Sequence, residues 1–295
     1  MVKKNKIIVT GGAGFVGTNL IRLLLRKTNY RLISIDNYSS GTKLNHIKNP
    51  RVKYIKGNTV GILKLIKNPK EIKSVFHFGE FARIYQSFLK MNECIESNTI
   101  GSNAVFNFCF KNKIKLIYSA TSASLGNKGD DKDLSPYAFT KAKNLELLEN
   151  LKRWFNFKYE VIYFYNVYGP HQISRGNMST VIGIFEDHYK RNKPLPIVKP
   201  GTQTRRFTHI DDTVNICFLA WKKNLCRHYS IANKKSYSIL EVAKMFKTKI
   251  KFLPKRPGER YASALTNMNL SNKMYKYYGK INLHDYVKSF ILKNY

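Results

Sequence analysis

The chain has 295 residues, 43% of them hydrophobic, so it can bury a large core as one domain or two unequal domains. Its formal net charge is +34, but the basic residues are spread along the whole chain and lysines outnumber arginines by 39 to 13. Nucleic-acid-binding surfaces concentrate their charge and favour arginine, so we interpret the excess as a solvated lysine surface and expect no nucleic-acid partner.

Two further compositional features narrow the class of protein. No apolar run reaches the roughly 18 residues that a membrane-spanning helix needs, so we expect no contact with a membrane. The four cysteines show neither CxxC spacing nor a nearby histidine cluster, which favours reduced thiols and no metal site. The expected location is the cytoplasm.

A strand, a tight turn and a helix are predicted at the start of the chain. Lys6–Thr10 is a short apolar stretch of the buried-strand type, and Phe15–Leu25 carries apolar residues at helical spacing. Between them, Gly11 permits unusual backbone angles, Gly14 allows close approach of a pyrophosphate, and Gly17 allows tight helix–strand packing. The pattern predicts a dinucleotide site whose phosphates meet the amino end of the helix.

A second strand over residues 30–35 is followed by Asp36. An acid about 20 residues beyond the last glycine of such a turn can accept hydrogen bonds from both hydroxyls of a ribose. A carboxylate there would repel a 2′-phosphate, so the sequence predicts NAD rather than NADP.

Strand-like and helix-like segments alternate up to about residue 165, which is typical of a parallel sheet covered by helices on both faces. Further strands are expected at 52–55, 74–78, 115–119 and 160–164, with helical segments near 61–66, 87–110 and 138–155. Prolines then interrupt shorter elements. We therefore expect a doubly wound α/β domain over 1–165, with part of 204–226 crossing back, and a smaller mixed α/β lobe over 166–295.

Tyr137 and Lys141 lie four residues apart at the start of the last of these helices, so their side chains share one face. A phenol has a pKa of about 10, and a neighbouring ammonium together with a cationic nicotinamide would lower it toward neutrality. Thr121, at the carboxyl end of the preceding strand, can hydrogen-bond a substrate oxygen. These three residues are the predicted catalytic group.

With these residues in place, the chain resembles the extended short-chain dehydrogenase/reductase family, whose core is a Rossmann-type sheet, and within it the UDP-glucose (UDP-galactose) 4-epimerases. The resemblance runs almost end to end. The matching segments occur in family order: TGGAGFVG at 10–17, DNYSSG at 36–41, HFG at 77–79, Asn98, the Thr121, Tyr137 and Lys141 group, YNVYGP at 165–170, QTRRFTHID at 203–211 and RPGE at 256–259.

The resemblance implies roles for individual residues. Cofactor contacts are expected from Gly11, Gly14, Phe15, Val16, Gly17, Asp36, Asn37, Ser40, Gly41, Asn58, Thr59, Phe78, Gly79, Asn98, Ser119, Tyr137, Lys141 and Tyr165. Contacts with a nucleotide sugar are expected from Thr121, Asn166, Arg205, Arg256 and Glu259. Two guanidinium groups suit a pyrophosphate, and a carboxylate suits a ribose diol.

The implied activity is NAD-dependent 4-epimerisation of a UDP-hexose. Oxidation at C4 gives a transient 4-keto sugar, and return of the hydride to the opposite face inverts the centre. Two alternatives stay open: a nucleotide-sugar oxidoreductase or 4-ketoreductase with the same catalytic group, and a catalytically silent NAD-binding regulatory module. Relatives pair two long helices in a four-helix dimer interface, so we expect a homodimer through the segments 87–110 and 138–155.

The departures from the family pattern bear on the reaction. In 4,6-dehydratases the catalytic threonine is followed by an acidic pair, whereas Thr121 is followed by Ser122 and Ala123. The chain therefore lacks the acidic residue that elimination from the sugar, or its decarboxylation, would require. Glu80 stands where the family usually has a small apolar residue. It is expected either to face the sugar or to support another residue of the site.

Overall fold

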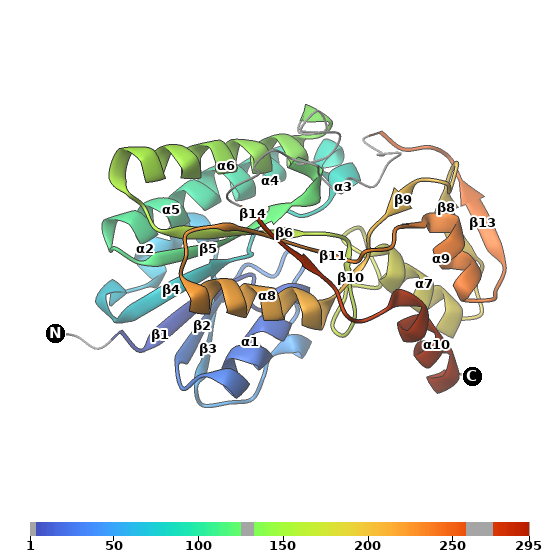
Figure 1. Ribbon diagram of the computed structural model, residues 1–295, viewed down its shortest axis with the longest axis horizontal. Coiled ribbons are helices and arrows are strands. Elements are labelled where there is room, and N and C mark those ends of the chain that lie inside the picture. The colour runs from blue at the N-terminus through green and yellow to red at the C-terminus, as the bar shows by residue number, and fades with distance from the viewer. Residues whose placement is uncertain (1–3, 125–132, 258–273, 295) are drawn as a thin grey trace.

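The computed structural model describes residues 4–124, 133–257 and 274–294. A single eight-stranded parallel sheet runs through the molecule, flanked by helices on both faces (Figure 1). From one edge to the other its strands are β14 (Met274–Tyr278), β11 (His228–Ala232), β6 (Tyr159–Phe164), β5 (Lys115–Thr121), β4 (Ile72–His77), β1 (Lys6–Thr10), β2 (Arg31–Asp36) and β3 (Val52–Lys56).

Strand order reverses between β1 and β4, because β2 and β3 lie on one side of β1 and the later strands on the other. In doubly wound sheets the ligand crevice opens beyond the carboxyl ends of the strands at this point. The central strands are apolar and β-branched, as in the fully buried Ile7, Ile8 and Val9 of β1. The sequence prediction of a Rossmann-type α/β fold is confirmed.

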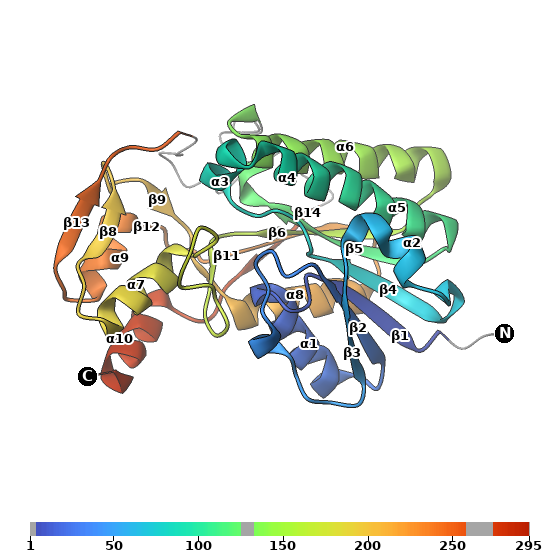
Figure 2. The same cartoon turned by 180° about the vertical axis from the view of Figure 1, so that it is seen from behind.

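Two groups of helices cover the sheet (Figures 1 and 2). One face packs against α1 (Phe15–Lys27) and α8 (Ile210–Lys223), which also contact each other. The other face carries α2 (Ile62–Leu65), α3 (Ile84–Leu89), α4 (Met91–Ile95), the wide π-type turn η4 (Glu96–Gly101), α5 (Ser102–Lys111) and α6 (Pro136–Phe155).

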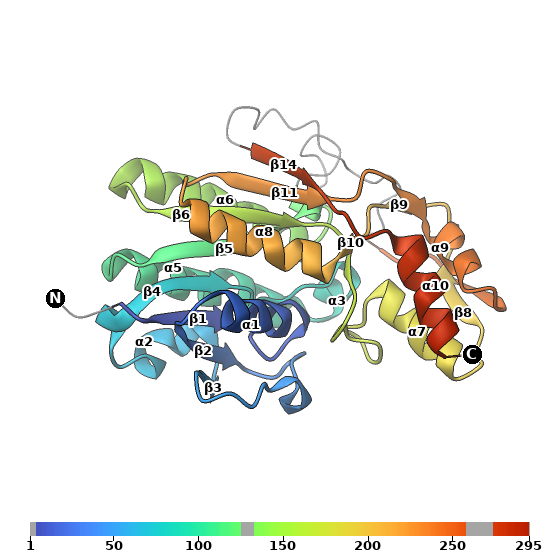
Figure 3. The ribbon, with the colours of Figure 1, turned by 60° about the horizontal axis from the view of Figure 1, so that its bottom comes forward.

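A second, smaller group of elements lies beyond the carboxyl ends of the strands and has its own apolar core (Figure 3). It contains α7 (Val181–Lys190), β8 (Leu195–Val198), β13 (Ile250–Leu253), β9 (Thr204–Arg205), β12 (Tyr237–Ser238), α9 (Ile239–Met245) and α10 (Leu283–Lys293). Two short strands, β7 (Val167–Tyr168) and β10 (Thr208–His209), connect this group to the sheet.

Segments beyond residue 226 also belong to the large sheet, because β11 pairs in parallel with β6 and β14 pairs in parallel with β11. The described part of the chain also contains four short 3₁₀ turns, η1 (Lys43–Asn45), η2 (Thr59–Gly61), η3 (Pro69–Glu71) and η5 (Ser122–Ser124). Within the described residues no helix is both long and apolar enough to cross a membrane.

Candidate active site

The turn between β1 and α1 forms a cradle of main chain. Gly11 has a φ of +69°, a conformation that side chains rarely adopt, and a Cβ there would come within 2.9 Å of the Gly79 backbone nitrogen. A Cβ on Gly17 would lie 2.1 Å from the Gly11 carbonyl oxygen, so this glycine permits the close packing of α1 on the turn. Gly14 is the N-cap of α1 and brings no side chain to the helix end, which is how a helix amino terminus accepts phosphate.

Asp36 ends β2 beside this cradle and is 7% exposed. Its carboxylate accepts hydrogen bonds from the backbone N–H groups of Ala13, at 2.9 Å, and Tyr38, at 2.8 Å. Burial raises the pKa of Asp36 above its ordinary value, and these backbone donors oppose the rise by stabilising the carboxylate. A Cβ on Gly41 would approach both carboxylate oxygens to 2.9 Å, so the glycine lets the 36–41 loop fold over the acid.

The cradle and Asp36 line one cavity at the carboxyl ends of the strands. Most of the residues expected to contact the cofactor line it: Gly11, Gly14, Phe15, Val16, Gly17, Asp36, Asn37, Ser40, Asn58, Thr59, Phe78, Gly79, Ser119, Tyr137 and Lys141. These residues lie at the carboxyl ends of β2 and β5, in the segments that follow β1, β2, β3 and β4, and in the first turns of α1 and α6. A glycine cradle with a buried acid at its far end fits a dinucleotide such as NAD.

Asn98 and Tyr165 were also expected to contact the cofactor, but the structure places them behind the cavity wall. Asn98 is fully buried, and its amide donates to the Phe81 carbonyl at 3.0 Å and accepts from the Phe81 N–H at 2.7 Å. The Tyr165 hydroxyl accepts from Ser230 at 3.3 Å. Phe164, the neighbouring residue, lines the cavity instead, because successive side chains of an extended segment point in opposite directions.

Tyr137 and Lys141 lie in the first turns of α6. Pro136 opens this helix, and the Ser135 hydroxyl caps it by accepting from the Ala138 N–H at 3.1 Å. Thr121 ends β5, and its hydroxyl accepts from the Ala123 N–H at 3.1 Å. A strand end and a capped helix start therefore hold the three predicted catalytic residues at the same edge of the sheet.

A second cavity extends from Tyr137 into the smaller group of elements. It shares Phe15, Val16, Ala82, Arg83, Tyr137 and Phe164 with the first cavity. Four of the residues expected to bind substrate line it: Thr121, Asn166, Arg205 and Arg256. The fifth, Glu259, lies outside the described residues.

These substrate candidates come from separate segments. Arg205, on β9, is 9% exposed, and Asn166 donates to the Arg206 carbonyl at 3.1 Å from a backbone with a φ of +37°. Arg256 lies over the Tyr85 ring, with 5.1 Å between the guanidinium carbon and the ring centre. The second cavity therefore combines two guanidinium groups, an amide and a hydroxyl.

Two residues that line the first cavity were not among the predicted site residues, although Glu80 was expected either to face the sugar or to support another residue of the site. Glu80 makes an ion pair with Lys141, and its only signal in the sequence was an acid in an otherwise apolar stretch. Arg83 is half-buried and donates two hydrogen bonds to the Met178 carbonyl, at 2.9 and 2.6 Å. Burial lowers the pKa of Arg83 from its ordinary value, and interaction with Tyr137 acts in the opposite direction.

A metal centre is not indicated by the described residues, which contain no group of three or more histidine, cysteine, aspartate or glutamate side chains that could hold an ion. Cys94, Cys109, Cys217 and Cys226 are free thiols. The chemistry of the site is therefore that of a hydroxyl, a phenol and an ammonium beside a dinucleotide cavity.

Comparisons with known proteins agree with this geometry. The chain is 27% identical over 259 residues to a putative UDP-glucose 4-epimerase of Methanocaldococcus jannaschii, covering 83% of each chain. It is 27% identical over 267 residues to a dTDP-D-glucose 4,6-dehydratase of Dictyostelium discoideum, covering 81% of this chain and 61% of that protein. A UDP-glucuronic acid 4-epimerase from Bacillus cereus, solved with UDP-glucuronic acid and NAD, superposes with a TM-score of 0.82 at 25% identity, covering 98% of this chain and 100% of the other.

The sequence profile described as the NAD dependent epimerase/dehydratase family matches residues 7–232, which include the glycine turn, Asp36 and all three catalytic candidates. NAD is therefore the cofactor, as the acid at the end of β2 indicated. Both epimerases and dehydratases are among the relatives, so the family alone does not choose the reaction. The protein is a member of the NAD-dependent epimerase/dehydratase family.

Proposed function

We propose that the protein is an NAD-dependent nucleotide-sugar 4-epimerase that acts on a UDP-hexose. The observation that carries this proposal is the position of Tyr137, which lines both the dinucleotide cavity and the second cavity. A sugar in the second cavity would present its hydroxyls to the phenol oxygen at the point where the nicotinamide end of the first cavity begins. Thr121 lines the second cavity on the same side.

The lining of the second cavity favours epimerisation over dehydration. Among the described residues that line it there is no aspartate or glutamate, and Thr121 is followed by Ser122 and Ala123. Elimination of water across C5 and C6 needs a group that takes the C5 proton and a group that protonates the leaving hydroxyl. Epimerisation at C4 needs a single acid–base group, which the phenol of Tyr137 supplies.

The charge of the second cavity favours an anionic substrate. Arg83, Arg205 and Arg256 all line it, and Arg205 and Arg256 come from different segments beyond the sheet. Guanidinium groups bind phosphate oxygens through fixed pairs of donors, so two of them on opposite sides suit a diphosphate. The net charge of +34 would further attract such a ligand to the protein.

In the proposed mechanism, Thr121 hydrogen-bonds the C4 oxygen of the sugar and aligns it with Tyr137. Tyr137 removes the C4 hydroxyl proton as a general base and later returns it to the same oxygen. Lys141, one helical turn beyond Tyr137 on α6, would hold the ribose next to the nicotinamide. NAD, bound along the glycine turn and Asp36, supplies the acceptor and donor of the C4 hydride. Inversion then requires only that the 4-keto sugar presents its other face before the second transfer.

A panel of UDP-, dTDP- and ADP-linked hexoses, followed by proton NMR without added cofactor, tests the proposal. We expect a mixture of two sugars that differ only at C4, formed from a UDP-hexose by protein that retains its own NAD. A 6-deoxy-4-keto product would assign the protein to the dehydratases. Consumption of added cofactor in proportion to product would indicate an oxidoreductase, and bound NAD without turnover of any sugar would indicate a regulatory module.

Two further proposals concern the setting of this activity. The four free thiols are typical of a reducing compartment, so we propose that the enzyme works in the cytoplasm. We also propose a homodimer that forms through α4, α5 and α6, the helices that cover the outer side of the sheet.

A further inference from the structure

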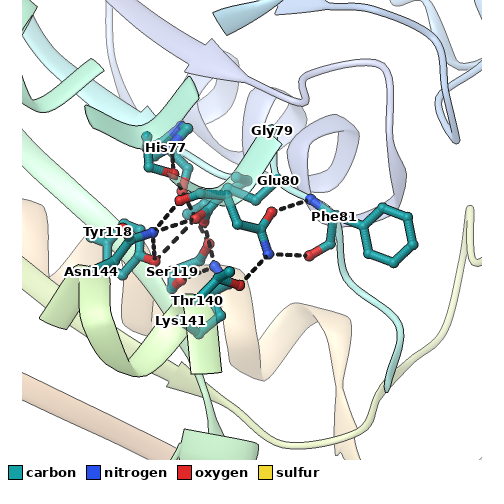
Figure 4. A network of polar contacts seen from close by, with 12 residues as sticks. His77, Gly79, Glu80, Phe81, Tyr118, Ser119, Thr140, Lys141 and Asn144 are labelled. Carbon is teal, nitrogen blue, oxygen red and sulfur yellow. Dashed lines mark hydrogen bonds and ion pairs between the residues drawn. The ribbon is translucent and has the colours of Figure 1, made fainter. Parts of the chain in front are cut away.

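Glu80 is a buried carboxylate at the floor of the cofactor cavity, with a side chain that is 1% exposed. Four side chains donate to it: the Lys141 ammonium, the Ser102 hydroxyl at 2.7 Å, the Tyr118 hydroxyl at 3.0 Å and the Asn144 amide at 3.3 Å (Figure 4). A buried charge is stable only when it is paired and hydrogen-bonded. This acid is therefore built into the site and does not face the sugar cavity.

Lys141 is held in a defined direction by the same network. Its ammonium donates to Glu80 and, at 2.6 Å, to the Ser119 carbonyl, and it lies 4.7 Å from the centre of the Tyr118 ring. An ammonium has three donors, and contacts with described residues use two of them. One donor remains for a ligand in the cofactor cavity that Lys141 lines.

A chain of hydrogen bonds joins Glu80 to the glycine turn. Two backbone N–H groups after β4 donate to the Thr10 hydroxyl at 3.1 and 3.0 Å, so this hydroxyl donates onward to His77 Nδ1 at 2.7 Å. Burial lowers the pKa of His77 to about 4, and the neutral ring then donates from Nε2 to Ser102 at 3.0 Å. Ser102 in turn donates to Glu80. Every donor along this chain thus points toward the carboxylate.

Three other titratable side chains that face the pair, His77, Cys94 and Tyr118, stay neutral in the ordinary working range. Besides His77 on β4, burial raises the pKa of Cys94 on α4 to about 11 and raises the pKa of Tyr118 on β5 well above its usual value. Tyr137 on α6 and Arg83 lie on the cavity side. Among the described residues in this network, Glu80 is the acid that offsets the charge of Lys141.

We propose that Glu80 is a positioning residue that fixes Lys141 between two acceptors and offsets its charge, so that the cofactor cavity favours oxidised over reduced NAD. A buried ammonium without a counter-ion, as Lys141 would be, would repel the positive nicotinamide ring of the oxidised cofactor. The reduced ring carries no such charge. The inference deepens the proposed function, because an epimerase must return to oxidised NAD after every turnover.

Glu80→Gln tests this inference, because it keeps the shape of the side chain and its capacity to accept from Ser102 while removing the charge. We expect the ratio of the Kd for NAD to the Kd for NADH to rise on the order of tenfold, since only the oxidised ring is charged. Both constants can be measured by fluorescence titration of protein stripped of nucleotide. A merely structural role for Glu80 would weaken both cofactors equally and leave the ratio unchanged, which would overturn the inference.

Glu160→Gln is the matched control. Glu160 is a fully buried carboxylate near the amino end of β6, whereas the cofactor cavity lies at the carboxyl ends of the strands. It pairs with Lys115 at 3.0 Å. Its replacement removes one buried negative charge from the same fold, and we expect the NAD to NADH ratio to stay at the wild-type value. A shift as large as that of Glu80→Gln would show that the effect is not specific to the active site.

A stability measurement on the apoprotein keeps the inference testable if Glu80→Gln alone folds poorly. Lys141→Met leaves the Glu80 carboxylate buried without its counter-ion, which is more costly than losing both charges. We expect the double variant Lys141→Met with Glu80→Gln to recover most of the loss in urea midpoint seen for Lys141→Met. Losses that simply add would contradict the ion-pair role.

These tests do not depend on the identity of the sugar. If the wild-type protein turns over no nucleotide sugar but the cofactor ratio shifts in Glu80→Gln, the proposed function fails and the role of Glu80 stands. If the protein epimerises a UDP-hexose and the ratio does not shift, the proposed function stands and the role of Glu80 fails.

Discussion

Tyr137 occupies the junction of the two cavities, and its hydroxyl is the atom on which the proposed acid–base chemistry depends. Tyr137→Phe removes this oxygen and keeps the ring that lines both cavities. We expect turnover to fall by about 10²-fold to 10⁴-fold, the usual contribution of a general base, while NAD stays bound. Turnover by NMR and cofactor content by absorbance check the two halves of this prediction.

Tyr165→Phe is the control for that experiment. Tyr165 follows directly after β6 and is 1% exposed. Its hydroxyl accepts a hydrogen bond from Ser230, and it lines neither cavity. Loss of the Tyr165 hydroxyl should lower the free energy of unfolding modestly and leave kcat near the wild-type value. A Tyr137→Phe variant as active as Tyr165→Phe would eliminate the phenol as the base.

Arg205 and Arg256 are expected to bind the two phosphates of the substrate from opposite segments of the second cavity. Binding of this kind is shared by the ground state and the transition state, so either alanine variant should raise KM far more than it lowers kcat. A hydrogen bond to a charged group contributes about 1.5 to 3 kcal/mol, which corresponds to an increase in KM on the order of ten- to a hundred-fold. Steady-state kinetics and competition by free UDP measure the effect.

Arg191→Ala is the matched control for those two variants, because Arg191 pairs with Asp187 on α7 and does not line the cavity. It should leave KM and competition by UDP unchanged. If both cavity variants behave like Arg191→Ala, the phosphates are bound elsewhere and the substrate class is wrong.

At the residue scale, the sequence predicted what depends on local geometry. Gly11 and Asp36 could be identified because the turn and the strand end that contain them are continuous in the chain. Asn98 and Glu80 could not be placed, because their partners Phe81, Thr140 and Lys141 meet them only after β4, β5 and α6 assemble. A buried acid in an apolar stretch signals a partner, but the sequence does not say which cation it is.

Secondary-structure elements were likewise predictable where they depend on the local sequence and not where they depend on contacts between distant segments. The six strands expected up to residue 165 all form, with ends that differ by at most two residues, because buried parallel strands are short apolar runs. The expected helix over 87–110 is instead divided at Lys90, and its middle is the wide turn η4. Asn98 lies within that turn and bonds the segment after β4, an interaction that helical periodicity does not reveal.

Helix α8 shows how a cap can be misassigned from sequence. Aspartate is a common cap residue, which favours Asp211, but the helix begins at Ile210 and the His209 ring accepts from the Asp211 N–H at 3.2 Å. The acid lies in the first turn, where a carboxylate still interacts favourably with the helix dipole. A histidine cap is less common than an aspartate cap, so the sequence favoured the wrong neighbour.

The cap of α6 links an element to catalysis, because Ser135 fixes the turn that contains Tyr137. Ser135→Ala should lower the free energy of unfolding by about 1 kcal/mol and also reduce kcat, as the helix start frays. Ser238→Ala, which removes the equivalent cap of α9, should cost a similar amount of stability without an effect on kcat. Urea unfolding and steady-state kinetics on both variants measure these outcomes. Equal kcat values in the two variants would contradict the link.

At the scale of the molecule, the chain leaves the sheet after β6, after β11 and after β14, and it returns after the first two of these excursions. The first return adds β11 and the second adds β14, so the sheet gains two strands from segments that are far apart in the sequence. Prolines and short elements hide these strands from pattern analysis, because a five-residue apolar run is equally compatible with a helix or a loop.

The outer side of the helices around η4 and α6 carries large exposed apolar side chains. They are Leu89, Met91, Ile95, Ile100 and Phe139, exposed by 64, 51, 41, 53 and 47%, respectively. Such a concentration on neighbouring helices suits a symmetric contact with a second copy. We expect light scattering at micromolar concentration to give the mass of a dimer, and Ile100→Lys to shift it toward the monomer. Leu292→Lys, at an exposed position on α10, is the control and should remain dimeric.

The central claim is that a single active site oxidises and then reduces the same sugar carbon, C4, with NAD that stays bound. A UDP-hexose that carries deuterium at C4, incubated with the purified protein and no added cofactor, tests it most directly. We predict that the C4 epimer forms and keeps its deuterium at C4, because the label moves as a hydride, which does not exchange with water. Loss of deuterium to solvent, or product with deuterium at C6 and none at C4, would contradict the account.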